Sequence, residues 1–82
     1  MSTSVVDVVA IAEEWAMGIP SEKRESAENF LKSYSSLGRE ATTNAMRGNG
    51  LPFPDSITDQ GVSGLSFRLF LTAALKILKE RI

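Results

Sequence analysis

Residues 64–81 read GLSFRLFLTAALKILKER, and this stretch decides the fold. On a helix with about 100° per residue, its polar residues gather within roughly 80° of the circumference, and apolar residues occupy most of the rest. The polar strip consists of Arg68, Thr72, Lys76 and Lys79. A surface helix of an ordinary domain needs an apolar stripe of only about 100°. The sequence therefore predicts a long, mostly buried C-terminal helix that is central to the fold, shared with another chain, or both.

The first half of the chain also predicts helices. A helix over residues 5–17 is followed by Gly18-Ile19-Pro20, a typical stop signal, although its valine-rich start is also compatible with a strand. A second helix over residues 22–37 carries one apolar stripe and ends before Gly38. A third over residues 39–47 spans only about two turns, so it needs tertiary support.

Residues 48–63 are predicted to form an irregular loop. The residues before Pro52 and Pro54 avoid the α region, so this part of the loop is extended. Leu51 and Phe53 are apolar residues in an otherwise turn-like segment, and we expect them to anchor the loop to the helices. A short helical turn between residues 58 and 62 is an alternative that Gly61 weakens.

The composition limits the chemistry. The 82 residues form one domain, 1–82, because they leave no room for a second core. The chain has no cysteine and no histidine, which excludes a disulfide framework, a metal held by these residues and a nucleophile activated by histidine. Nine basic residues against ten acidic ones do not favour non-specific binding to a polyanion. We expect no catalytic residues, no cofactor and no metal site.

Dimerisation is predicted from the surplus of apolar surface. The other helices offer single stripes, which do not easily cover about 240° of the last helix and one another. The fold class predicted is therefore an all-α bundle of three to four helices that is completed by a second copy, with two-fold symmetry. The predicted dimer or partner interface comprises Phe67, Phe70, Leu71, Ala74, Ile77 and Leu78, with Trp15 and Phe53 as secondary anchors.

A helix-turn-helix is the alternative interpretation of segment 27–47, because two helices joined by a tight turn with a glycine have that outline. In this interpretation Ala41, Ala45 and Met46 face inward. The residues that would contact DNA are Arg39, Thr43 and Arg47. Few other basic residues surround them to bind phosphates, so a simple helical hairpin is favoured over this alternative.

The function predicted is that of a small, non-catalytic, homodimeric module that binds another protein and has a regulatory role. A DNA-binding regulator is the second hypothesis. An enzyme with a pocket lined by Trp15, Tyr34 and Phe53 is the third. The N-terminus lacks a basic region before its apolar run, and Arg68 and Lys76 interrupt the longest apolar stretch, so we expect a cytoplasmic protein without a membrane span.

Overall fold

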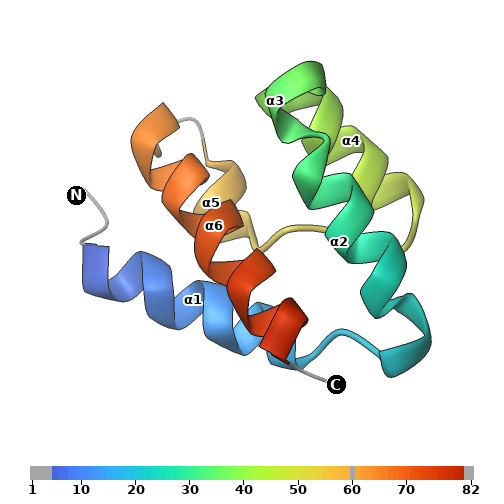
Figure 1. Ribbon diagram of the computed structural model, residues 1–82. Helices are drawn as coiled ribbons and strands as arrows, with labels where there is room; N and C mark the ends of the chain where they lie inside the picture. Colours follow the sequence, from blue (N-terminus) through green and yellow to red (C-terminus); the bar gives the residue numbers. More distant parts are fainter. Residues whose placement is uncertain (1–4, 60, 81–82) are drawn as a thin grey trace.

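Helices make up the regular secondary structure of the computed structural model, which describes residues 5–59 and 61–80 (Figure 1). No strand occurs in these ranges, so the all-α prediction is confirmed and the valine-rich start is helical. The elements are α1 (Val5–Met17), the 3-10 turn η1 (Ser21–Lys23), α2 (Arg24–Lys32), α3 (Tyr34–Leu37), α4 (Arg39–Gly48), α5 (Asp55–Thr58) and α6 (Gly64–Glu80). Residue 81, the predicted end of the last helix, lies outside the described residues.

Helix α6 lies at the centre of the packing. Its buried residues are Phe67, Phe70, Leu71, Ala74 and Leu78, and its polar strip of Arg68, Thr72, Lys76 and Lys79 is exposed as predicted. Helix α1 crosses α6 and packs against it (Figure 1). The side of α1 that is buried carries Val8, Ala12 and Ala16, spaced four residues apart and all 0% exposed. Such small residues let two helix axes approach closely.

Figure 1 shows α2, α3 and α4 grouped on one side of the molecule and α1, α5 and α6 on the other. Arg24 joins the two groups, because its guanidinium donates to the carboxylate of Glu28 at 2.9 Å and to the carbonyl of Leu78 at 3.4 Å. The Leu78 carbonyl lies at the C-terminal end of α6, where the helix dipole favours a cation.

The predicted helix 22–37 is interrupted at Ser33. The Ser33 hydroxyl donates to the carbonyl of Asn29 at 2.9 Å, and its N–H is shared between the carbonyls of Asn29 and Phe30, both at 3.2 Å. A serine that bonds back to residue i−4 bends a helix. The prediction of one continuous helix was therefore wrong in detail: a 3-10 turn, α2 and α3 follow one another.

Helix α4 faces the core with a side that matches the prediction only in part: Met46 is buried as predicted, Ala45 is half-buried, and Ala41 is not buried. Thr42 and Met46 are buried at 0% exposure, whereas Ala41 is exposed. Arg39, three residues before Thr42, turns its guanidinium over the ring of Phe67 at 4.8 Å from the centroid. The inward positions are thus 39, 42 and 46, with the i, i+3, i+7 spacing of one helix face.

The predicted loop 48–63 contains one turn of helix, α5, at residues 55–58 and not at the residues 58–62 considered from sequence. The Pro54 carbonyl accepts hydrogen bonds from the N–H groups of Ile57 at 2.9 Å and Thr58 at 3.2 Å. Ile57 is fully buried, so a tertiary contact fixes this turn. Leu51 and Phe53 are 6% and 4% exposed, which confirms their prediction as anchors.

The folded chain has the dimensions expected of a compact monomer of its length. The radius of gyration is 11.6 Å, close to the value of about 11.7 Å for a folded domain of this length. The exposed area of 5189 Å² is close to the roughly 4,800 Å² of a compact monomer of this mass. The single chain buries five residues of its last helix, whereas Leu65 on the same helix is 81% exposed. The dimer stays a prediction. Among the described helices, none has the length and apolar character needed to cross a membrane.

Thr42 carries a buried hydroxyl for which the described residues provide no hydrogen-bond partner. Thr42→Val should raise the free energy of unfolding by about 1 kcal/mol, because a methyl group of the same shape avoids this desolvation cost. Thr43→Val is the matched control: the Thr43 hydroxyl donates to the Arg39 carbonyl at 2.8 Å, so its loss should not stabilise the protein. Urea unfolding followed by circular dichroism measures both changes. A destabilised Thr42→Val variant would contradict this account of the core.

Candidate functional site

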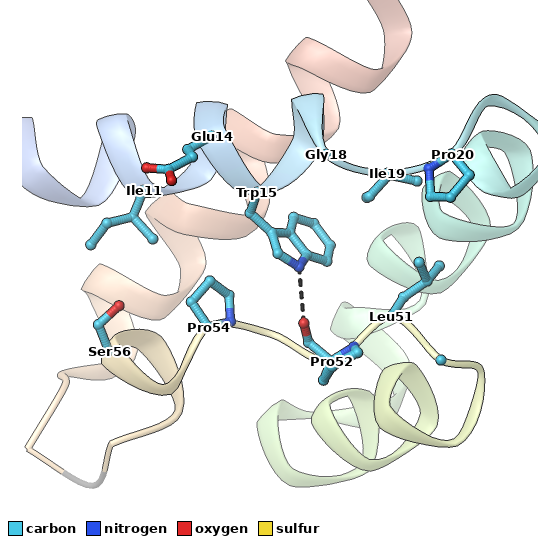
Figure 2. A pocket seen from close by; sticks show the side chains of 11 residues that line it. Ile11, Glu14, Trp15, Gly18, Ile19, Pro20, Leu51, Pro52, Pro54 and Ser56 are labelled. Atoms are coloured by element: carbon cyan, nitrogen blue, oxygen red, sulfur yellow. Dashed lines mark hydrogen bonds between the residues drawn. The ribbon is translucent and has the colours of Figure 1, made fainter.

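A groove of about 540 Å³ lies between the C-terminal half of α1 and the segment that connects α4 with α5 (Figure 2). We call residues 50–54 the strap. The lining residues come from α1 and the turn after it, from the strap and from α5. They are Ile11, Glu14, Trp15, Gly18, Ile19, Pro20, Gly50, Leu51, Pro52, Pro54 and Ser56. The groove is therefore mostly apolar and open along one side.

Trp15 is the central residue of this groove. Figure 2 shows its indole ring reaching from α1 toward the strap, where Nε1 donates to the Pro52 carbonyl at 3.0 Å. The ring packs against Phe53 at 5.2 Å and against Phe70 at 5.3 Å between centroids. It remains only partly buried. Contacts to the core thus hold the indole in place while part of it stays available in the groove.

Local chemistry makes both walls stiff. Pro20 and Pro54 adopt the extended polyproline conformation, with φ of −58° and −59° and ψ of 144° at both. Buried Ile19 ties the turn after α1 to the core, and buried Leu51 does the same for the strap. The N–H of Leu51 donates to the Met46 carbonyl at 2.9 Å. The shape of the groove is therefore set before any ligand arrives.

Glu14 is the one ionisable residue that lines the groove. Its side chain is exposed and lies near Ile11 and Trp15 at the rim (Figure 2). The neighbouring Glu13 is also exposed but does not line the groove. The groove is thus apolar with an acidic rim.

The residues predicted for an interface lie mostly inside the chain. Phe67, Phe70, Leu71, Ala74, Leu78 and Phe53 are buried in the core, and Ile77 is half-buried against it. A second copy could reach the buried ones only if α6 left this core. Of the eight predicted residues, Trp15 alone lines the groove. Sequence reasoning missed the other lining residues, although the prolines at 20, 52 and 54 mark its stiff walls.

The three predicted DNA contacts do line one hollow, together with Glu40, Asn44 and Thr58. However, the guanidinium of Arg39 donates to three backbone carbonyls, of Val62 at 2.7 Å, Asp59 at 3.1 Å and Ile57 at 3.4 Å. Thr43 bonds to the backbone of α4. Arg47 is the exposed member, and its partner is Asn44 Oδ1 at 3.4 Å. Arg39 thus clasps the α5–α6 connection to α4 and does not present its guanidinium outward.

The acidic residues do not gather into a buried site. In the ranges 5–59 and 61–80 every carboxylate is exposed except that of Glu28, which is half-buried and pairs with Arg24 at 2.9 Å. The same ranges hold no group of three residues suited to ligating a metal ion. Comparison with known proteins gives no match to a family model, a curated protein or a solved structure.

Arg39→Met should lower the free energy of unfolding by about 2 kcal/mol, because three carbonyls lose a charged donor while the side chain keeps its length over Phe67. Arg47→Met is the control: it removes the same charge from the same helix at an exposed position and should cost no more than about 0.5 kcal/mol. Chemical unfolding of both variants measures the difference. Equal losses would show that Arg39 does not act as a clasp.

Proposed function

We propose that this protein is a small, non-catalytic binding module whose groove between α1 and the strap takes a segment of a partner protein. The observation that carries the proposal is Trp15, which is held firmly by the core and is still partly exposed in an apolar groove. Tryptophan is enriched among the residues that dominate binding free energies, particularly when it lies in a well-packed hollow.

The stiffness of the walls supports this proposal. Binding costs less conformational entropy when the receptor surface is already ordered. Here two extended prolines, the buried side chains of Ile19 and Leu51 and the hydrogen bond from Trp15 order both walls. A groove of about 540 Å³ accommodates a few side chains of a peptide.

The chemistry of the lining favours a protein segment over a polar small molecule. Sites for small molecules combine apolar walls with several polar groups that converge to fix the orientation of the ligand. The lining of this groove contributes one carboxylate, from Glu14, and one side-chain hydroxyl, from Ser56. Apolar side chains of a partner, excluded from water against Trp15, are a better match.

Trp15 provides the test, because it is the only tryptophan of the chain. Random peptides displayed on phage and selected against the full chain should yield binders that shift the fluorescence of Trp15. Ser56→Phe places a bulky ring in the groove and should weaken these binders by about tenfold or more. Ser36→Phe makes the same change at an exposed position of α3, outside the groove lining, and should have no effect. Binders that tolerate Ser56→Phe would refute the groove as the binding site.

We expect the module to act as a single chain, because the two phenylalanines of α6 and Leu78 are fully buried within it. Light scattering after size exclusion should give the mass of one chain, 8.9 kDa, at protein concentrations on the order of 100 μM. A mass that doubles with concentration would instead support the homodimer predicted from the sequence. In that case Leu65→Lys should restore the mass of one chain if the dimer interface includes the exposed side of α6, because Leu65 is 81% exposed there.

A further inference from the structure

We propose that the segment bound in the groove carries a lysine or arginine beside its apolar side chains, and that this cation pairs with Glu14. The inference rests on the proposed function, since it names the chemistry of the partner for the same groove. The inference concerns a single position of the partner segment, namely the position that lies next to Glu14 at the α1 rim of the groove.

The position of Glu14 is the first argument. It is the one charged group of the lining, and the interactions found among the described residues include no ion pair for it. In Figure 2 the carboxylate lies along α1 close to Ile11, at the rim of the groove. A peptide that fills the apolar part would therefore pass close to an unneutralised negative charge. A cation at that point is favoured, whereas an aspartate or glutamate is repelled.

The end of helix α1 is the second, independent argument. Glu14 lies in the last turn of α1, which contains no basic residue. The C-terminal end of a helix carries the negative end of its dipole, so an acidic residue there is locally unfavourable. A sequence that breaks such a local rule without compensation inside the fold is typical of functional positions. The dipole and the carboxylate together make this end of the groove attractive to a cation.

The strap supplies the third argument, which concerns how the segment is recognised. Pro52 and Pro54 have no N–H, and the Pro52 carbonyl already accepts the Trp15 indole N–H. The strap cannot therefore offer a regular ladder of backbone hydrogen bonds to an added strand. Recognition therefore depends on side chains: apolar ones that pack against Trp15 and Ile11, and a charged one that pairs with Glu14.

The far end of the groove gives the segment a direction. Lys23 lies beside Gly50, and its ammonium is 3.5 Å from the Asn49 carbonyl. Gly50 precedes Leu51, which lies across the groove from Glu14 in Figure 2. A cation of the partner is therefore disfavoured near Gly50 and favoured near Glu14.

The test uses the peptides selected from the phage library. The strongest binder and a copy with its lysine or arginine replaced by norleucine are titrated against the parent chain, Glu14→Gln and Glu13→Gln, with Trp15 fluorescence as the readout. Glu14→Gln should weaken the cationic peptide about two- to fivefold, and Glu14→Lys should weaken it further. Glu13→Gln, which removes the same charge one residue away, should change nothing. The norleucine copy should bind Glu14→Gln and the parent chain with the same affinity.

The possible failures are separable. Binders that are blocked by Ser56→Phe but lack a cation, or that tolerate Glu14→Gln, would overturn this inference and leave the groove function standing. An absence of binders blocked by Ser56→Phe would overturn both. Urea unfolding of Glu14→Gln checks that weaker binding does not come from a destabilised fold. The unfolding midpoint of this variant should equal or exceed that of the parent, because the substitution removes an acidic group from the C-terminal end of a helix.

Discussion

The insertion of Phe53 between α1 and α6 is the interaction on which the rest of the structure depends. Its ring lies 5.2 Å from Trp15, 5.6 Å from Phe67 and 5.4 Å from Phe70, with near-perpendicular arrangements against both α6 rings. Aromatic rings gain from edge-to-face contacts beyond the area that they bury. Phe53 thus fastens the strap to two helices at once, and the small side chains of α1 allow these helices to lie close together. The strap and α1 together bury the side of α6 that carries Phe67 and Phe70.

The same insertion creates the groove. Because Phe53 is held in the core, the prolines on either side of it are held along α1, and the Pro52 carbonyl meets the indole N–H of Trp15. Some residues therefore both stabilise the fold and line the groove. Trp15 contributes one part of its ring to the core and another to the groove, so Glu14, Glu13 and Ser56 are better positions than Trp15 for separating binding from folding.

Local rules predicted much of the fold. The bounds of α1 and the start of α6 follow from stop signals and from helical periodicity, and the exposed strip of α6 follows from the spacing of Arg68 and the lysines. The inward turn of Arg39 does not follow, because its acceptors are the carbonyls of residues 57, 59 and 62, which lie 18 to 23 residues further along the chain. The turn α5 depends on the burial of Ile57, and the groove depends on a strap that meets α1 from 37 residues away. Such contacts leave no periodic trace in the sequence.

The amino-acid sequence by itself determined that the chain is helical, that α6 keeps an exposed polar strip apart from its buried side, and that no disulfide contributes to its stability. These properties depend on composition and on spacing within one helix, which are local. Only the tertiary structure decided what covers the buried side of α6: the small-residue face of α1 and the ring of Phe53. The amount of apolar surface on a helix predicts how much area must be buried. It does not predict which other surface covers that area, because the hydrophobic effect is not directional. That choice depends on contacts between distant residues, and the groove beside Trp15 is its consequence.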